Sequence, residues 1–339
     1  MTPIAYSAFL RRFIERFDPD QGWLTSEGCV APSDEHLRSA WQALVEKPTA
    51  DFDREARRLR QRIQAGLIYR LLHGIDQFRD TVRVTTALAE AALEASLAHH
   101  TPILEQAFGV PQDRRFVVLG MGKLGGRELN LSSDIDIFCV FATDGETQGP
   151  RVRDHGEFFT RLTQNMAKSL DQQTADGFVA RVDQRLRPWG SAGQLAIPVV
   201  ACEDYYEVHG REWERFALLK ARPVAGDLAL GLDLLGALKP FMYRKYLDFG
   251  VFESIRDLKS KIEVEVRRSG RETNVKVGRG GIREIEFIVQ SMQLLRGGQI
   301  PRLQVTGFLP ALEGLIAEQI MPAEDGTRLR DDYLWLRHV

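Results

Sequence analysis

Apolar residues near the start of the chain recur at the spacing of an α-helix. A four-residue repeat places its members on one face of a helix, and this repeat runs through Leu59, Ile63, Leu67 and Leu71. The arginines between these positions are expected to form the solvated face of that helix: Arg57, Arg58, Arg60 and Arg62. A second helix, rich in Ala, Leu and Glu, is predicted over residues 82–97. Residues 1–112 are therefore predicted to be a helical region.

The pattern changes after Arg115, where short apolar runs replace the helical spacing. The four apolar residues at 116–119 end in glycines, as expected for a buried strand that is followed by a turn. Further strands are predicted at 135–140, 177–183 and 194–200, with a helix at 157–170. Residues 113–228 are therefore predicted to be a core domain that contains a small mixed sheet.

Helical patterns return from about Cys202 onward. Amphipathic segments at 252–268 and 281–295 assign residues 229–339 to a second helical region. This region is expected to be truncated, because residues 331–339 still have a helical pattern without a cap or a breaker. The predicted fold class is α+β, a small mixed-sheet core flanked by helical regions and mostly helical overall.

The composition argues against several classes of protein. The 339 residues carry a formal net charge of −2, which disfavours a general nucleic-acid binder, since such proteins have a strong excess of Lys and Arg. The three cysteines form no CxxC pair, so neither a disulfide framework nor a Cys-rich zinc site is expected. No segment approaches the roughly 20 apolar residues of a membrane span, and no secretory signal is evident. A cytoplasmic protein without membrane or nucleic-acid partners is expected.

The chemistry is concentrated between Gly120 and Asp136. Glycines after a strand let a phosphate approach the backbone closely. Asp134 and Asp136 are two residues apart on a predicted strand, so their carboxylates project from one face. Two like charges so close repel each other unless a cation lies between them, and Mg²⁺ is the natural cation for carboxylates and phosphate. The alternative is that the aspartates only cap or turn the chain, as Asp often does at a strand start.

Other polar residues are candidates for the same site. Asp183 ends a predicted strand and is expected to supply a third carboxylate. Arg185 and Arg187 are two apart and are expected to share a face and bind phosphate by bidentate forks. Lys220 is a further candidate cation. Glu284 and Glu286 lie two apart in a predicted helix, do not share a face there, and are expected to have a structural or substrate-orienting role.

The segment GMGKLGGRELNLSSDIDIF, from Gly120 to Phe138, resembles the signature of the glutamine synthetase adenylyltransferase/adenylyl-removing enzymes. Their cores belong to the DNA polymerase beta-like nucleotidyltransferase superfamily. The resemblance continues through DGFVARVDQRLRPWGSAG, EDYYEVHGREWERFALLKAR and GRGGIREIEFIVQ. It implies that Asp134, Asp136 and Asp183 are the catalytic metal ligands. The implied nucleotide- and phosphate-binding residues are Gly120, Gly122, Lys123, Ser133, Arg185, Arg187 and Lys220.

Full-length members of this family resemble a duplicated protein with two such domains. The amino-terminal copy removes AMP from a tyrosine of glutamine synthetase by phosphorolysis and releases ADP, whereas the carboxy-terminal copy attaches AMP from ATP. GREWERFALLKAR and GGIREIEF are similar to the amino-terminal copy. The resemblance therefore implies a deadenylylase with two Mg²⁺ ions, or Mn²⁺, whose partners are adenylylated glutamine synthetase, phosphate and ADP. The PII signalling protein is an expected partner of the full-length enzyme.

Two alternatives remain open on the sequence. The same residues suit the forward, ATP-dependent adenylylation of glutamine synthetase. A regulatory module that binds nucleotide without turnover belongs to a different class. The three intact aspartates count against that second alternative, because a decayed site is expected to lose at least one of them.

Overall fold

The computed structural model describes residues 3–149, 151–243, 249–271 and 273–338. The chain divides into two compact units. The first unit contains Met1–Val199 and Pro223–Gly231, and the second contains Val200–Arg222 and Leu232–Val339. The units group the chain differently from the three regions expected from the sequence, because the amino-terminal helices and the sheet share one hydrophobic core.

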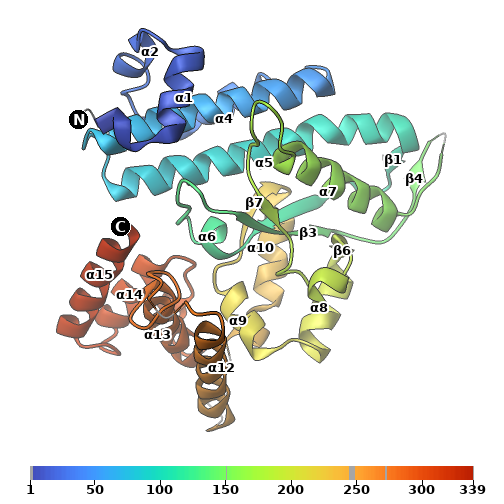
Figure 1. Ribbon diagram of the computed structural model, residues 1–339. Coiled ribbons are helices and arrows are strands. Elements are labelled where there is room, and N and C mark those ends of the chain that lie inside the picture. Colours follow the sequence, from blue (N-terminus) through green and yellow to red (C-terminus); the bar gives the residue numbers. More distant parts are fainter. Residues whose placement is uncertain (1–2, 150, 244–248, 272, 339) are drawn as a thin grey trace. The chain divides into compact units, whose positions relative to one another are not determined.

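Helices make up the start of the first unit (Figure 1). Their bounds are α1 (Ala8–Phe17), α2 (Gly22–Thr25), α3 (Asp34–Gln42), α4 (Thr49–Leu72) and α5 (Phe78–Phe108), after a 3-10 turn at Pro3–Tyr6. The predicted apolar stripe lies on α4, where Leu67 is fully buried and packs with Leu37 and Val84. The residues from Pro3 to Phe108 are therefore mostly helical.

Two expectations about these helices are wrong. Arg57 was expected on a solvated face, but its guanidinium is buried and donates to the carbonyls of Asp53, Ser169 and Gln172. The predicted second helix extends well beyond residue 97, because α5 continues through His99 to Phe108. Position on a long helix packed on both sides, rather than residue polarity, decides which side chains are buried here.

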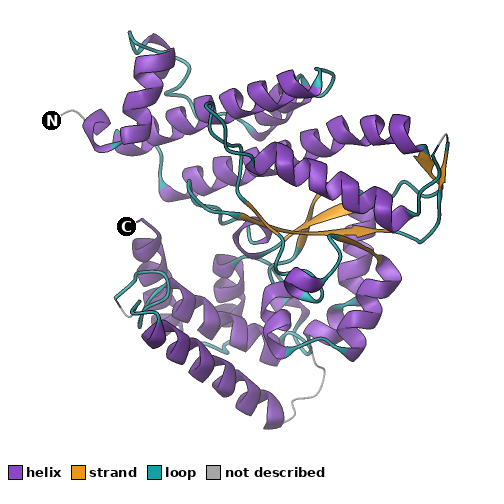
Figure 2. Ribbon diagram, turned by 45° about the vertical axis from the view of Figure 1, so that its right-hand side comes forward, coloured by secondary structure: helices purple, strands orange, loops and turns teal. Residues whose placement is uncertain are grey.

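A five-stranded sheet lies at the centre of the first unit (Figure 2). Its strands are β2 (Phe116–Gly120), β3 (Ile135–Phe141), β5 (Val182–Asp183), β6 (Ala196–Pro198) and β7 (Arg222–Gly226). β3 pairs antiparallel with β2 on one side, and parallel with β5 and then β6 on the other. Because β3 has both antiparallel and parallel neighbours, the sheet is mixed, as predicted; β7 pairs with β2. A separate two-stranded ribbon joins β1 (Val110–Pro111) to β4 (Thr147–Gln148).

The strands on the β5 and β6 side are shorter than the sequence predicts. The strand expected at 177–183 forms only over its last two residues, and the strand expected at 194–200 ends where α8 (Val199–Val208) begins. Val179 and Ala180 of the first segment pack in the core while their backbone is loop, and residues 199–200 of the second begin a helix, so an apolar run alone did not specify a strand there.

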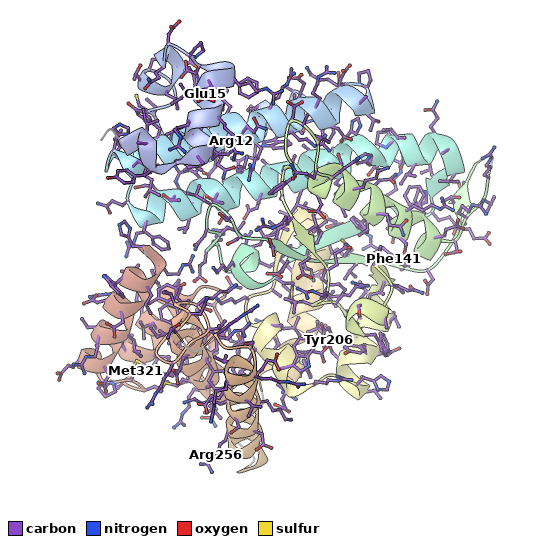
Figure 3. The ribbon with its side chains drawn as sticks, in the orientation of Figure 1. Arg12, Glu15, Phe141, Tyr206, Arg256 and Met321 are labelled. Carbon is purple, nitrogen blue, oxygen red and sulfur yellow. The ribbon has the colours of Figure 1, made fainter. Side chains whose placement is uncertain are left out.

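One face of the sheet is covered by α5 and α7 (His155–Asp171). Alternate residues of β3 point into this layer, including Ile137 and Phe141, and the ring of Phe141 stacks 5.0 Å from that of Phe159 (Figure 3). Because side chains alternate along a strand, the residues at 134 and 136 belong to the opposite face. The helix layer therefore supports the sheet from behind and leaves the acidic positions uncovered by it.

The second unit is helical. It contains the following helices, of which α8 and α10 begin in the first unit: α8, α9 (Glu212–Leu218), α10 (Leu228–Ala237), α11 (Lys239–Met242), α12 (Phe249–Arg268), α13 (Ile282–Arg296), α14 (Phe308–Ala317) and α15 (Ala323–His338). Its last three helices share a core in which the rings of Phe308 and Tyr333 stack 4.0 Å apart. The α+β, mostly helical fold class is thereby confirmed.

The sequence predicted neither a membrane-spanning segment nor a disulfide framework. Within residues 3–149, 151–243, 249–271 and 273–338, no helix is long and apolar enough to cross a bilayer. The three cysteines, Cys29, Cys139 and Cys202, are free thiols.

Candidate active site

The glycine segment forms a tight turn between β2 and the short helix α6 (Gly122–Gly125). Gly122 has a φ of 51°, which favours glycine, and a Cβ at this position would lie 2.7 Å from Oδ2 of Asp136. The backbone N–H of Met121 donates to the carbonyl of Asp136 at 2.8 Å. The turn therefore holds the Asp136 carboxylate directly against the backbone of Gly122.

Gly120 has a different environment. It is buried at the end of β2, and a Cβ there would lie 2.7 Å from Val224 and 2.9 Å from Leu124. The absence of a side chain is thus required by packing between strands. A phosphate contact by the Gly120 backbone stays a prediction.

Asp134, Asp136 and Asp183 are brought together at the start of β3. Asp136 and Asp183 are direct partners across parallel strands, which are about 4.8 Å apart in a sheet, so both side chains project from the same face. Asp134 lies two residues earlier, in the segment that enters β3, and the intervening Ile135 is buried on the other side. The grouping expected from spacing is therefore present in the backbone.

Two arginines neutralise the outer carboxylates. The guanidinium of Arg181 is hydrogen-bonded and ion-paired with Asp134. Arg185 makes a bidentate pair with Asp183, with Nη2 to Oδ2 at 2.5 Å and Nε to Oδ1 at 3.0 Å. Hydrogen bonds from Arg185 hold the pKa of Asp183 below its usual value, and the same bonds, together with the charges of Asp136 and Asp134, raise the pKa of Arg185. The carboxylates therefore share one electrostatic environment.

These residues fit a divalent cation in chemistry and in backbone placement. Carboxylate oxygens are the protein ligands that Mg²⁺ takes, and the Gly122 cradle leaves one face of Asp136 against backbone. Among the described residues, no three acidic, His or Cys side chains are gathered tightly enough to hold a metal ion. Asp134 and Asp183 face their arginines instead, and Arg185 has 78% of its side chain exposed, so it is free to swing away.

Arg187 does not share a face with Arg185. Its guanidinium is buried and donates to three backbone carbonyls of its own loop, those of Gln184, Ser191 and Gly193. The expectation of a shared face used the period of a strand, but β5 ends at Asp183, so that period does not apply to either arginine. Arg187 closes the loop between β5 and β6, and its binding of phosphate stays a prediction.

Ser133 and Lys123 lie in the two segments that flank the carboxylates. Oγ of Ser133 accepts a hydrogen bond from the backbone N–H of Asn130 at 3.1 Å, which closes the turn before β3. Lys123 is half-buried on α6, and its carbonyl accepts from Glu128 N–H at 2.8 Å. Their positions are compatible with nucleotide binding, which remains a prediction for both.

Lys220 belongs to the second unit. Its ammonium group is buried and pairs with Glu286 on α13 at 2.8 Å, beside the stacked rings of Phe216 and Phe287. Glu284, on the same helix, instead pairs with Lys259 at 3.1 Å and accepts from Gly280 N–H at 2.7 Å. The two glutamates thus face different partners, as expected from their spacing. Phosphate binding by Lys220 stays a prediction.

The sequence analysis missed the role of Arg181. It stood inside a predicted strand and was given no function, although a cation next to an acidic strand is a signal for an ion pair. The residue at 181 and the residue at 134 are 47 positions apart, and only the pairing of β5 with β3 brings them together.

Two family profiles match the sequence of this chain. The profile of the glutamate-ammonia ligase adenylyltransferase family matches residues 4–237, which is more than half of the chain. The chain belongs to this family. A second profile, described as GlnD PII-uridylyltransferase, matches residues 256–339.

Individual relatives of the family support the assignment. The chain is 48% identical over 295 residues to a bifunctional glutamine synthetase adenylyltransferase/adenylyl-removing enzyme of Hahella chejuensis, which covers 85% of this chain and 31% of the relative. It is 47% identical over 314 residues to the enzyme of the same description from Pseudomonas aeruginosa, covering 89% and 32%. The chain therefore spans about a third of the length of these curated relatives.

Proposed function

We propose that this chain removes AMP from an adenylylated tyrosine of glutamine synthetase by phosphorolysis and releases ADP. One observation supports nucleotidyl transfer above all, which is the grouping of three carboxylates beside a glycine turn. Asp136 and Asp183 are partners on parallel strands, and Asp134 is two residues before Asp136. The Gly122 turn lies against the carboxylate of Asp136. Carboxylates grouped next to a glycine turn are what a metal-assisted transfer of a phosphorus group requires.

Asp134, Asp136 and Asp183 would hold Mg²⁺, as two ions, with Mn²⁺ as the alternative. The bound metal supplies charge stabilisation at the phosphorus and alignment of the attacking and leaving oxygens. Arg185, once displaced from Asp183, would bind a phosphate oxygen, and its exposure allows that movement. The bare backbone at Gly122 allows a phosphate to approach closely.

The proposed step exchanges one phosphate ester bond for one phosphoanhydride bond. An oxygen of inorganic phosphate attacks the phosphorus of the tyrosyl-AMP ester, and the bond from that phosphorus to the tyrosine oxygen breaks. The tyrosine oxygen leaves and takes up a proton, and the new bond makes ADP. The direction rests on the similarity of GREWERFALLKAR and GGIREIEF to the amino-terminal, adenylyl-removing copy. The alternative is ATP-dependent adenylylation by the same residues.

The proposed partners follow from that reaction. They are adenylylated glutamine synthetase as substrate, phosphate as co-substrate and ADP as product, in the cytoplasm. The PII signalling protein would act through the full-length enzyme.

The test uses adenylylated glutamine synthetase with radiolabelled inorganic phosphate. We expect labelled ADP to form only when the chain, phosphate and Mg²⁺ are all present. A parallel reaction supplies unmodified glutamine synthetase with ATP labelled in its α-phosphate. Label on the synthetase in that second reaction, with no ADP in the first, would show the forward activity instead. Asp136→Asn serves as the inactive control in both reactions.

A further inference from the structure

The first unit contains a cavity of about 250 Å³ between its helices and the segments beside β3. Its walls come from α4, α5 and residues 129–135 and 178–181. Among its lining residues there are two cations, Arg60 and Arg181, and no Asp or Glu. Asp134, which is adjacent in sequence to two lining residues, is not part of the wall. The charged groups of its wall are therefore cations, in an otherwise mostly apolar lining.

Arg60 differs from the other arginines of α4. Each of those has a partner: Arg54 pairs with Asp51, Arg57 with backbone carbonyls, Arg58 with Glu55, Arg62 with Glu27 and Arg70 with Asp76. The Cζ atom of Arg60 lies 5.0 Å from the centre of the Phe178 ring, and among the described residues the guanidinium has no ion-pair partner. Burial and then the charge of Arg181 lower the pKa of Arg60 to about 10. A half-buried cation in this position lacks a counter-ion.

Arg181 connects the cavity to the candidate active site. Its guanidinium lies 5.6 Å from the centre of the same Phe178 ring, and it is paired with Asp134 and hydrogen-bonded to the carbonyl of Ser132. Both Arg181 and Asp134 have half of their side chains exposed, so solvent screens the pair and weakens it. A stronger anion on the cavity side would compete with Asp134 for this arginine.

Gln64 adds a polar group to the same wall. It lies four residues after Arg60 on α4, which places both on one face of the helix. Its side-chain oxygen is buried without a hydrogen-bond partner within the part of the chain that the structure describes. A ligand that both accepts from guanidinium groups and donates to an oxygen would satisfy this wall, and a protonated phosphate does both.

The geometry points to a binding site for a small phosphate-type oxyanion, held by Arg60, Arg181 and Gln64, whose occupancy draws Arg181 away from Asp134. The volume is below the roughly 300–1,000 Å³ of pockets that enclose larger ligands, so a free oxyanion fits better than a whole nucleotide. Binding by Arg60 stands without the proposed function. The coupling to Asp134 rests on it, because it requires that Asp134 holds the metal.

Release of Asp134 makes the coupling reciprocal. An anion that removes Arg181 from Asp134 increases the affinity of Asp134 for a cation, and a bound cation must then increase the affinity for the anion by the same factor. Phosphate and Mg²⁺ are therefore expected to bind with positive cooperativity even when no synthetase is present.

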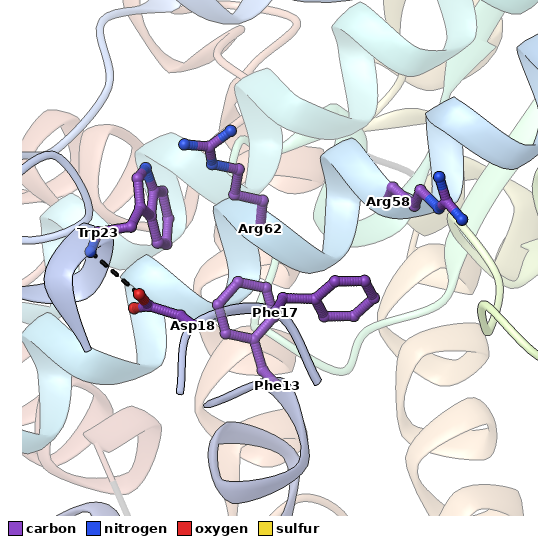
Figure 4. A pocket seen from close by; sticks show the side chains of 6 residues that line it. All are labelled: Phe13, Phe17, Asp18, Trp23, Arg58 and Arg62. Carbon is purple, nitrogen blue, oxygen red and sulfur yellow. Dashed lines mark hydrogen bonds between the residues drawn. The ribbon is translucent and has the colours of Figure 1, made fainter. Parts of the chain in front are cut away.

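The test is calorimetric titration of the 339-residue chain with inorganic phosphate. We expect Arg60→Gln and Arg181→Gln each to weaken phosphate binding at least tenfold, and Arg60→Lys to retain part of it. Arg62→Gln is the matched control: Arg62 lies two residues along α4, over the ring of Trp23 in a different cavity that includes Asp18 (Figure 4), and binding is expected to be unchanged. Circular dichroism and urea unfolding confirm that each variant is folded.

Three further measurements separate this site from the catalytic one. If Arg185→Gln abolishes phosphate binding while Arg60→Gln does not, the cavity is not the site. AMP should bind here at least tenfold more weakly than free phosphate, and equal binding would overturn the small-anion assignment. Phosphate should tighten Mg²⁺ binding several-fold in the parent but not in Arg60→Gln, and an unchanged Mg²⁺ affinity in the parent would overturn the coupling. Failure of phosphorolysis would leave the phosphate titrations intact.

Discussion

Two Asp-x-Arg turns in the first unit have almost the same local geometry and differ in what surrounds them. In one, Arg115 donates from Nε and Nη2 to Asp113 at 3.1 and 2.6 Å; in the other, Arg185 donates to Asp183 at 3.0 and 2.5 Å. Each arginine also donates its backbone N–H to the same aspartate. In both turns the hydrogen bonds from the arginine lower the pKa of the aspartate.

Their places in the sheet differ. Asp113 precedes β2 and has no strand partner, whereas Asp183 lies on β5 opposite Asp136. Only the second turn adds a carboxylate to an existing acidic position. A short ion pair therefore does not by itself identify a catalytic site. The strand register that places Asp183 opposite Asp136 is what distinguishes the second turn.

The largest expected difference between the two turns is catalytic. Asp183→Asn should lower the rate of the proposed transfer by about 1,000-fold, which is about 4 kcal/mol, because a metal ligand is lost. Asp113→Asn should stay within about twofold of the parent, since it removes the same kind of ion pair elsewhere. Steady-state rates of both variants, with circular dichroism as the check on folding, measure the contrast. Equal losses would mean that Asp183 acts through stability alone.

The second difference concerns what holds each turn in place. Arg187 closes the loop after Asp183 with three hydrogen bonds to buried or partly buried carbonyls. Arg187→Met should lower the free energy of unfolding by about 2–3 kcal/mol, because these acceptors lose their donor. Arg185→Met and Arg115→Met, both at exposed arginines, should leave it nearly unchanged. Urea denaturation compares the three, and a stable Arg187→Met variant would contradict the bracing role.

The smallest expected difference appears in acid. The pKa of Asp113 is lowered to about 2 by Arg115, so its pair stabilises the fold above the ordinary carboxyl pKa of 3.8 and this contribution is lost as the pH falls toward 2. Because Arg115 is exposed, the loss should be at most about 1 kcal/mol. It is measured as the stability difference between the parent and Asp113→Asn at about pH 5 and about pH 2.5. A difference that grows in acid would reverse the sign and contradict the assignment.

Most of the fold could be predicted from hydrophobic spacing. The compact apolar runs of β2 and β3 have one dominant explanation each, so both strands were predicted to within one residue of their bounds, and the stripe from Leu59 to Leu71 lies within α4. The segments before β5 and β6 could not be assigned in this way. In the segment before β5, apolar residues such as Val179 pack in the core while the backbone forms loop, and that outcome depends on tertiary contacts that local spacing does not contain.

In the candidate site, too, local spacing predicted some features, whereas others depend on tertiary structure. The spacing of Asp134 and Asp136 was enough to place both on one face, and the strand order was needed to add Asp183. The ion-pair partners of the cations could not be predicted, because they are distant in the sequence. Arg181 pairs with Asp134, and Lys220 pairs with Glu286. Arg60 was expected in solvent, yet it lines a cavity in which it lacks a counter-ion among the described residues.

Gly122 has a consequence for the interpretation of related chains. Its positive φ and the 2.7 Å approach of Asp136 to the place of a Cβ together disfavour a side chain at this position, since the carboxylate of Asp136 would have to move. Among related chains, a copy that has lost its activity is usually sought by the loss of an aspartate. A copy that kept all three aspartates but replaced this glycine would have a displaced Asp136 and a silent site. Position 122 is therefore a marker of functional decay that a search for acidic residues alone would overlook.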